Sequence, residues 1–376
     1  MNKIIIEKDI LIHNINAIKK RANLVGEKAP KIIAVVKGNS FGMGVSNVIP
    51  ILKENDISFF ATATIEEALE VREIDKDCEI LILNSYSYEE DIKRIVSNNL
   101  TMEISSIDNL KKLIKECEMQ DKIVNAQIKL DTGFCRFGFR AEDFLNDENK
   151  IIELKELIQS QDRVKITGIY SHFQQSFERN SKRTKEQFNL FLNVINRFKN
   201  NGLDINFYHI SNSEAFFKYP EMFLDAVRLG GAFTGRAPSS YEIGLKRVGY
   251  LETNILDTKK LKKDDRVGYG STYKIKEDTN VAIVGAGYYD GIFIFGPRDE
   301  ARTIDKLRHI KAWLISLFQD ENKYVIINQK KYKVLGRIGM SNFVIDIGND
   351  DIKPNDKVRV EVNLVLANQK IPRILV

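Results

Sequence analysis

The sequence has few of the residues that build disulfide frameworks, zinc sites or histidine clusters. Its 376 residues include only 3 cysteines and 4 histidines. Cys78, Cys117 and Cys135 lie far apart and have the spacing of neither zinc ligands nor a disulfide framework. We therefore expect no metal site and a reducing compartment.

Long apolar runs are missing as well. No run approaches the roughly 20 residues that a membrane helix needs. The apolar start at residues 4–6 is broken at once by Glu7, Lys8 and Asp9 and shows no cleavable signal pattern. These absences predict a cytoplasmic protein without a membrane partner.

Neither sign of charge dominates. The chain carries 57 basic and 52 acidic side chains, a net charge of +5, without a basic block, so nucleic acid is not an expected partner. Its length and its 43% of hydrophobic residues predict two domains with a large core. No GxGxxG fingerprint opens the first strand–helix unit, which counts against a Rossmann domain.

Apolar strands and amphipathic helices alternate through the first two thirds of the chain. Eight strands are predicted, at residues 31–36, 58–61, 79–83, 100–104, 124–130, 164–170, 205–210 and 224–228. The helices between them include a charged one over residues 141–160. A doubly wound sheet uses the same alternation, but eight repeats of this length favour an α/β fold with a (β/α)8 TIM-type barrel over residues 10–240.

Beyond residue 240 the strands become short, β-branched and separated by turn residues. This texture predicts a mainly-β domain over residues 241–376, which the first strand, within residues 1–9, joins. One helix interrupts it over residues 301–320, where Ile304, Leu307 and Leu314 recur at helical spacing. A helix of this size in a β domain has the character of an insertion.

The stretch around Lys37 organises the first domain. Five apolar residues, 32–36, lead into Lys37, and a loop with three glycines follows. A lysine at the end of a buried strand lies where barrel enzymes place their chemistry. The pattern fits equally a lysine whose amine reaches solvent and a desolvated lysine with a lowered pKa that forms a Schiff base.

This stretch resembles the cofactor-lysine motif of the alanine racemases, pyridoxal-phosphate (PLP) enzymes with a barrel and a β domain. Further segments resemble the family's motifs in the correct order, at residues 129–138, 168–173, 211–213, 228–231, 267–270, 287–291 and 336–340. Each motif is weak by itself. Their order over most of the chain is a strong signal, and the count of eight strands agrees with it.

The resemblance implies a racemase with two bases. Lys37 holds PLP covalently and, once released, is the base for one face of the substrate's α-carbon. Tyr269 is the base on the opposite face. A phenol normally titrates near pH 10, so it needs help from its neighbours, which in the family is a hydrogen-bonded chain that maps to Tyr269, His172 and Arg228. Taken alone, Tyr269 fits a half-buried aromatic residue beside a turn better than a base.

The remaining cofactor contacts are implied in the same way. Arg228 binds the pyridine nitrogen and, because arginine stays protonated, leaves the ring a weak electron sink, which suits racemisation. His172 lies beside the ring. The phosphate is expected at residues 212–213 and 230–231, which are Asn212, Ser213, Gly230 and Gly231. By themselves such residues are explained by ordinary turns.

Two residues are implied for the substrate carboxylate. Arg136 binds it through its planar guanidinium, and Met340 contributes a backbone N–H. Lys129 aligns with a lysine that many family members carbamylate, so that it orients Arg136; an ordinary lysine paired with Asp131 explains the residue equally well.

The sequence departs from the family pattern at several positions. Phe41 stands where a phosphate-binding tyrosine is usual, and Ser341 where an aspartate is usual. Residues 364–370 offer no counterpart of a second phosphate-binding tyrosine. These departures bear on cofactor affinity and on the substrate, for which the resemblance implies alanine or a related small or basic amino acid.

The resemblance also implies a homodimer with shared active sites, in which Tyr269 and Met340 act on the partner's Lys37. Three alternatives stay open. A decarboxylase of the same architecture needs a cysteine in the β domain, and all three cysteines precede residue 136. A PLP carrier built from a lone barrel does not fit the long β domain. A catalytically altered PLP-binding or regulatory homologue would keep the fold without the chemistry.

Overall fold

The computed structural model describes residues 2–24, 29–178, 181–237, 243–294, 303–316 and 323–376. The chain divides into two compact units. One is Lys8–Val248, and the other combines Met1–Glu7 with Gly249–Val376. In the described part of the chain, no helix is long and apolar enough to cross a membrane.

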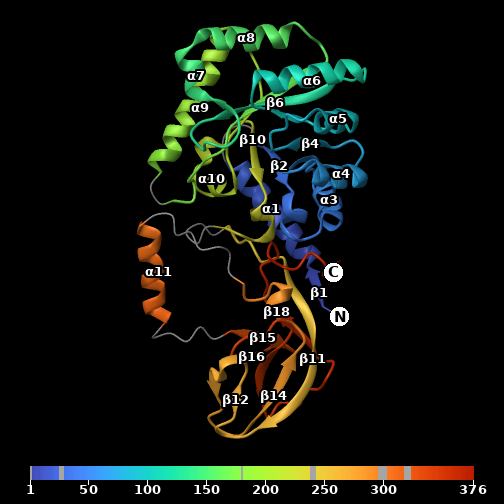
Figure 1. The fold of residues 1–376 in the computed structure, drawn as a ribbon, viewed down its shortest axis with the longest axis vertical. Helices are drawn as coiled ribbons and strands as arrows, with labels where there is room; N and C mark the ends of the chain where they lie inside the picture. Colours follow the sequence, from blue (N-terminus) through green and yellow to red (C-terminus); the bar gives the residue numbers. More distant parts are fainter. Residues whose placement is uncertain (1, 25–28, 179–180, 238–242, 295–302, 317–322) are drawn as a thin grey trace. The chain divides into compact units, whose positions relative to one another are not determined.

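The first unit is a closed barrel of eight parallel strands (Figure 1). The strands are β2 (Lys31–Val35), β3 (Phe59–Thr62), β4 (Glu79–Ile82), β5 (Met102–Ile104), β6 (Val124–Asp131), β8 (Val164–Tyr170), β9 (Tyr208–His209) and β10 (Ala226–Leu229). They pair in chain order, β10 returns to β2, and a bridge between Leu81 and Thr101 joins β4 to β5. This closure confirms the predicted TIM-type barrel and excludes a doubly wound sheet, which would have two edges.

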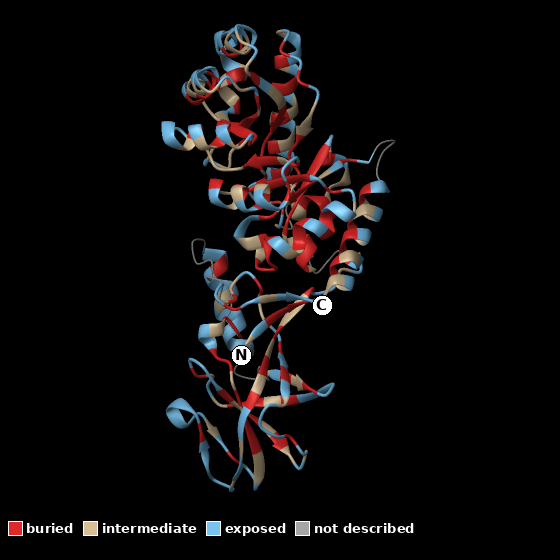
Figure 2. Cartoon of the chain, turned by 90° about the vertical axis from the view of Figure 1, so that its right-hand side faces the viewer, coloured by how far each residue is buried: buried red, intermediate tan, exposed pale blue. Residues whose placement is uncertain are grey.

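Helices surround the strands because each buries one apolar stripe. They are α1 (Lys8–Asn23), α3 (Val45–Glu54), α4 (Ile65–Ile74), α5 (Glu89–Ser97), α6 (Ile107–Met119), α7 (Ala141–Asn146), α8 (Glu148–Gln159), α9 (Lys182–Asn200) and α10 (Ser213–Lys218). In α6, for example, Leu110, Leu113 and Cys117 recur at helical spacing and are fully buried. Figure 2 shows the buried strands inside and the exposed helix faces outside.

Two sequence expectations in this unit need correction. The single helix predicted over residues 141–160 is two helices, because Asp147 adopts an extended conformation (φ −136°, ψ 105°) and its side chain accepts the N–H of Asn149 to start α8. The strand predicted over residues 205–210 pairs only at Tyr208 and His209.

The second unit is a β-barrel whose strands pair antiparallel except for β1 with β19, which agrees with the predicted mainly-β domain. Its strands are β1 (Lys3–Ile6), β11 (Gly249–Leu261), β14 (Thr279–Val284), β15 (Tyr324–Ile327), β16 (Lys330–Leu335), β17 (Phe343–Gly348), β18 (Lys357–Val360) and β19 (Arg373–Leu375), with a short pair, β12 (Arg266–Val267) and β13 (Tyr273–Lys274). The long strand β11 pairs with β18 through its first half and with β14 through its second half, which closes the ring. Val281 and Leu335 belong to its core.

The boundary between the units lies after Val248 rather than at residue 240. The side chain of Asn14 in α1 explains this, because it donates to Lys246 O at 2.8 Å and accepts the Lys246 N–H at 2.8 Å. These two bonds fix the segment before Gly249 on the first unit. At the other end of the chain, β1 pairs with β11 and so belongs to the β unit.

The helix expected in the β unit is present as α11 (Thr303–Ser316). Residues 301–302 and 317–320, at the two ends of the predicted range, lie outside the described residues.

Candidate active site

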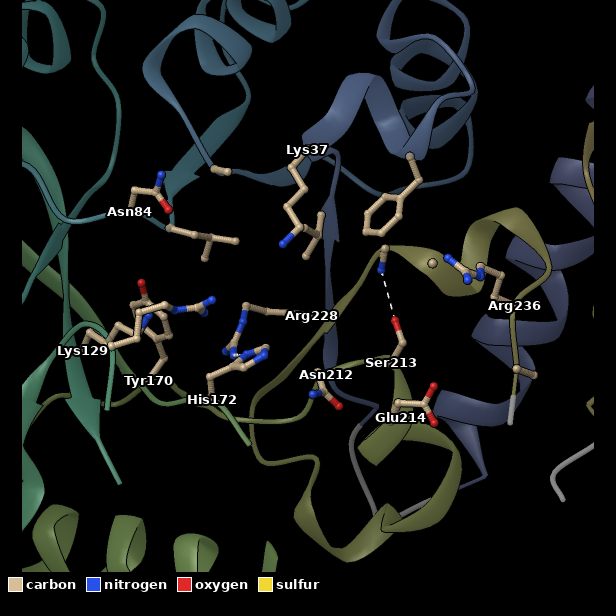
Figure 3. A pocket seen from close by; sticks show the side chains of 18 residues that line it. Lys37, Asn84, Lys129, Tyr170, His172, Asn212, Ser213, Glu214, Arg228 and Arg236 are labelled. Atoms are coloured by element: carbon tan, nitrogen blue, oxygen red, sulfur yellow. Dashed lines mark hydrogen bonds between the residues drawn. The ribbon is translucent and has the colours of Figure 1, made fainter. Parts of the chain in front are cut away.

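A cavity of about 640 Å³ opens at the carboxyl ends of the barrel strands (Figure 3). This is the end at which barrel enzymes carry their active sites. Eight of the residues that the sequence assigned to a cofactor or substrate line it: Lys37, Arg136, His172, Asn212, Ser213, Arg228, Gly230 and Gly231. The other two, Tyr269 and Met340, belong to the β unit.

Lys37 stands directly before a turn of left-handed backbone, which the sequence analysis did not foresee. Gly38, Asn39, Ser40 and Phe41 have φ between 53° and 62°. Three of these residues have side chains, and each costs about 1–2 kcal/mol in this conformation. The turn persists because hydrogen bonds hold it: Gly38 N–H donates to Glu67 Oε1 at 2.6 Å, and Asn39 Oδ1 accepts the Val45 N–H at 2.8 Å. Strain of this kind concentrates at functional sites.

The Lys37 amine is tuned toward its neutral form. The side chain as a whole is exposed, yet its pKa is lowered from the usual value, chiefly by desolvation of the amine and secondly by the like charge of Arg136. Glu67 acts in the opposite direction. A lowered pKa makes a neutral, nucleophilic amine available nearer to neutral pH.

Arg228 is buried and surrounded by neutral acceptors. Its Nη1 donates to His209 Nδ1 at 2.5 Å and to the His209 carbonyl at 3.3 Å. Its Nη2 donates to Ser171 O at 2.6 Å, His172 Nδ1 at 3.2 Å and Ile210 O at 3.4 Å. Only Nε has no partner among the described residues. Burial lowers the Arg228 pKa to about 10, so the side chain keeps its charge at neutral pH.

Both histidines beside Arg228 are neutral. Burial and the positive charge of Arg228 hold the pKa of His172 and that of His209 well below the usual value. Because each accepts a hydrogen bond at Nδ1, each carries its proton on Nε2. His209 Nε2 donates to Gln127 Oε1 at 2.8 Å, inside the barrel. His209 was not among the residues predicted from the sequence, although a histidine inside a predicted strand was a usable signal.

Ser213 and Asn212 lie where β9 leads into α10. Ser213 Oγ accepts the Gly230 N–H at 3.2 Å. Asn212 Oδ1 caps α10 by accepting the Ala215 N–H at 3.0 Å and also accepts the Ser176 hydroxyl at 2.9 Å. Asn212 is therefore first a structural cap, while Ser213 connects two of the segments that the sequence assigned to a phosphate.

The loop that carries Arg136 is built around Asp131. Asp131 Oδ1 accepts the N–H groups of residues 133–135 at 2.8, 2.8 and 3.1 Å. The loop places the Arg136 guanidinium carbon 4.3 Å from the ring centroid of Phe134 and 5.7 Å from that of Phe137. Two aromatic rings thus orient the guanidinium, which leaves its donors available to a ligand.

Lys129 forms no ion pair with Asp131, whose Oδ1 accepts the three backbone N–H groups of the loop. Its amine lies 5.2 Å from the ring centroid of Tyr170 and 5.5 Å from that of Phe137. The largest opposite charge that acts on it is Glu103. The alternative of an ordinary lysine was therefore wrong about the partner, because the opposite charge that acts most on Lys129 is Glu103 and not Asp131.

Glu103 is a buried acid that the sequence analysis did not single out. It pairs in register with Gln127 on the neighbouring strand, two residues before Lys129, and is 0% exposed. Neither carboxylate oxygen has a hydrogen-bond partner in the described ranges. Burial raises the Glu103 pKa to about 7 and lowers the Lys129 pKa to about 8, and each group opposes the shift of the other. One acidic residue inside an otherwise uncharged predicted strand was the signal for it.

In the β unit, Tyr269 and Met340 form part of one exposed surface. Tyr269 is 74% and Met340 53% exposed. The N–H groups of Tyr288 and Tyr289 donate to the carbonyls of Gly339 and Met340, both at 3.1 Å. A Cβ on Gly339 would lie 3.7 Å from Tyr269 Cε2. The three β-unit motifs of the sequence thus meet at a surface rich in tyrosine.

Comparison with known proteins gives one consistent family. The model for "Alanine racemase, N-terminal domain" matches residues 6–238, and that for "Alanine racemase, C-terminal domain" matches residues 248–372. The alanine racemase of Clostridium tetani is 31% identical over 358 residues, which are 94% of this chain and 84% of the relative. That of Fusobacterium nucleatum is 31% identical over 380 residues, which are 99% and 94% of the two chains.

Solved structures agree in fold. The alanine racemase of Clostridium difficile 630 has a TM-score of 0.82 at 24% identity, over 100% of this chain and 95% of that one. The enzyme of Bacillus anthracis, solved with bound L-Ala-P, has a TM-score of 0.77 at 23% identity with the same coverage. The chain therefore belongs to the alanine racemase family, isomerases that use pyridoxal phosphate.

Proposed function

We propose that the protein is a PLP-dependent racemase that interconverts the L- and D-forms of alanine or a related small or basic amino acid. The observation that carries this proposal is the pairing of two groups in one cavity. A lysine amine with a lowered pKa ends one barrel strand, and a buried arginine with one unused N–H lies on another.

The residues present fit the cofactor. The Arg228 Nε–H is a donor suited to the pyridine nitrogen, because every other N–H of that side chain is already bonded. Lys37 supplies the amine for covalent attachment. Ser213, Gly230 and Gly231 line the cavity together, and their hydroxyl and backbone N–H groups are the donors that we propose for the phosphate.

When bound, PLP makes the substrate's α-hydrogen acidic by withdrawing electrons from the α-carbon. Lys37 Nζ then takes or returns that proton on one face, for which its lowered pKa suits it. Arg136 binds the substrate carboxylate through its guanidinium, which Phe134 and Phe137 hold in place.

The second base is proposed to be Tyr269, whose hydroxyl acts on the opposite face. Its 74% exposure supports a role at an interface rather than in the core of its own unit. We propose a homodimer with shared sites, in which Tyr269 and the Met340 N–H reach the partner's Lys37. The cytoplasmic location expected from the sequence stays a prediction.

A catalytically altered PLP-binding homologue is the second candidate. It is favoured by Phe41, whose ring brings no hydroxyl to the cavity.

Chiral chromatography separates the two candidates. Protein loaded with PLP is incubated with L-alanine, L-serine and L-lysine, and the D-enantiomers are measured. The racemase proposal predicts a D-enantiomer with wild-type protein and none with Lys37→Ala. Loading with PLP, shown by borohydride reduction and the mass of the Lys37 peptide, without any D-product supports the altered homologue instead.

A further inference from the structure

One side of the proposed phosphate site has no polar side chain. The Phe41 ring lies against Gly230, where a Cβ would stand 2.3 Å from the ring's Cε2 and 2.5 Å from its Cζ. The ring therefore covers the backbone with carbon atoms alone. Away from this ring, the proposed phosphate site offers backbone N–H groups and the Ser213 hydroxyl, which already accepts the Gly230 N–H at 3.2 Å.

Arg236 lies at the same site and is a residue that neither the sequence motifs nor the proposed function uses. It lines the cavity together with Ser213, Gly230 and Gly231, and Figure 3 shows it beside Ser213. Its aliphatic stem packs over Gly231, whose Cβ position is 3.9 Å from Arg236 Cδ. A larger residue at 231 would meet this stem.

The backbone of Arg236 is fixed while its charge is not used. Its N–H donates to Gly231 O at 3.2 Å. The preceding Gly235 has φ +85°, and a Cβ there would stand 2.0 Å from Lys246 O, so only glycine fits this close approach. The guanidinium makes no ion pair or side-chain hydrogen bond with the residues that the structure describes, and the side chain is exposed.

The charge of Arg236 acts on Glu214 without a direct contact: burial raises the Glu214 pKa, and the charges of Lys218 and Arg236 oppose that rise. Glu214 is the one carboxylate among the residues that line this cavity. It forms no ion pair with Arg236 within the described ranges. The planar guanidinium of Arg236 lies at the rim of the proposed phosphate site. Its N–H groups are suited to donate two hydrogen bonds to two oxygens of one phosphate group.

We propose that the Arg236 guanidinium binds the 5′-phosphate of the cofactor and supplies the contact that Phe41 does not. The proposal rests on the proposed function, since it needs PLP in this cavity. It assigns a phosphate ligand to a position outside the predicted set, and it makes affinity for the phosphate group depend on charge rather than on a phenol hydroxyl.

Paired titrations of the apoprotein test it with a binding readout. PLP and pyridoxal, which lacks the phosphate, are each titrated into wild type, Arg236→Gln, Arg236→Lys and the control Arg140→Gln. Hydrogen bonds to charged groups contribute about 1.5–3 kcal/mol, so Arg236→Gln should weaken PLP binding by about 10- to 100-fold. The affinity for pyridoxal should not change. The PLP affinity of Arg236→Lys should lie between those of wild type and Arg236→Gln, and that of Arg140→Gln should equal that of wild type.

Competition by inorganic phosphate gives a second readout. Phosphate should displace PLP from wild type more effectively than from Arg236→Gln, whereas sodium chloride at equal ionic strength should not separate the two. The apoproteins of wild type and Arg236→Gln should unfold at the same temperature, because the Arg236 side chain has no polar partner among the described residues.

The outcomes are distinguishable. Equal PLP affinity in wild type and Arg236→Gln overturns this proposal and leaves the proposed function intact. Equal weakening of PLP and pyridoxal also overturns it, because the loss then does not come from the phosphate. Absence of PLP binding to wild type overturns the proposed function itself.

Discussion

At the scale of single residues, the centre of the site is Arg228, a positive charge with no ion-pair partner among the described residues. Arg228 is bonded only to carbonyls and to two neutral histidines, so its positive charge persists in the barrel. His209, which accepts one of these bonds, is itself held by Gln127, whose Oε1 accepts the His209 Nε2 proton. The sequence motifs indicated Arg228 and His172, whereas the role of His209 follows from the pairing of β9 with β10.

Replacement of His209 tests this support. His209→Leu leaves one Arg228 N–H and the Gln127 oxygen without partners, and each unsatisfied buried group costs about 1–3 kcal/mol. We expect a lower free energy of unfolding in urea and weaker PLP binding. His209→Asn, which keeps an acceptor and a donor, should lose less of both. Equal stability of His209→Leu and wild type would contradict the assigned hydrogen bonds.

Glu103 makes stability depend on pH. Its pKa is raised from 4.5 to about 7 in the folded state, so between these values the folded chain binds more protons than the unfolded chain. Its contribution to stability is therefore complete below pH 4.5 and is lost as the pH rises through about 7. Lys129 acts oppositely, since its lowered pKa makes stability rise with pH between about 8 and 10.5.

Urea unfolding at pH 5 and pH 7 measures the acid part of this effect. Raising the pH from 5 to 7 should lower the free energy of unfolding of wild type more than that of Glu103→Gln. The difference should be about 1–3 kcal/mol, because one pKa unit corresponds to about 1.4 kcal/mol. Glu118→Gln, at an acid on the surface of α6, serves as the control and should follow wild type. Parallel curves for wild type and Glu103→Gln would contradict the raised pKa.

At the scale of elements, the left-handed turn after Lys37 is the feature that the sequence least revealed. Three glycines nearby predicted a loop, but of Asn39, Ser40 and Phe41 only the asparagine belongs to a type that is enriched at positive φ. The turn forms because Glu67, three residues into α4, and Val45, at the start of α3, bind it. Such bonds between distant segments cannot be read from local propensity.

A pair of glycine variants isolates the role of this turn. Gly38 (φ +62°) and Gly348 (φ +54°) both face open space, so a methyl group at either meets nothing within 4 Å. Alanine at each should reduce stability by about 1 kcal/mol through backbone strain alone. Only Gly38→Ala should also weaken PLP binding, because Gly38 follows Lys37. Equal effects of the two variants on PLP binding would contradict a special role for the turn.

At the scale of the whole molecule, the sequence predicted the fold of the first unit, the mainly-β class of the second, and their order. Eight strand–helix repeats were enough for the barrel, and turn-separated β-branched strands were enough for the β unit. The boundary after Val248 and the exposed tyrosine surface were not predictable, because the first depends on Asn14 binding a segment far along the chain. The exposed tyrosine surface depends on which of the three β-unit motifs the strand pairing of that unit brings together.

Mixed dimers test whether the sites are shared. Lys37→Ala and Tyr269→Phe should each be inactive alone. If each site takes Lys37 from one subunit and Tyr269 from the other, a reassociated equal mixture regains one intact site in half of its dimers, about a quarter of wild-type activity. A mixture that stays inactive after reassociation, with heterodimers shown by mass, would place both residues in one chain.

The most direct test of the two-base claim is exchange of the α-hydrogen in deuterated water. Wild-type protein with PLP bound is given L-alanine and D-alanine separately, beside a panel of other amino acids. The account predicts deuterium at the α-carbon and both enantiomers from either start, and, for Tyr269→Phe, exchange that continues from only one enantiomer. No exchange with any amino acid, or exchange from both enantiomers by Tyr269→Phe at the wild-type rate, would contradict it.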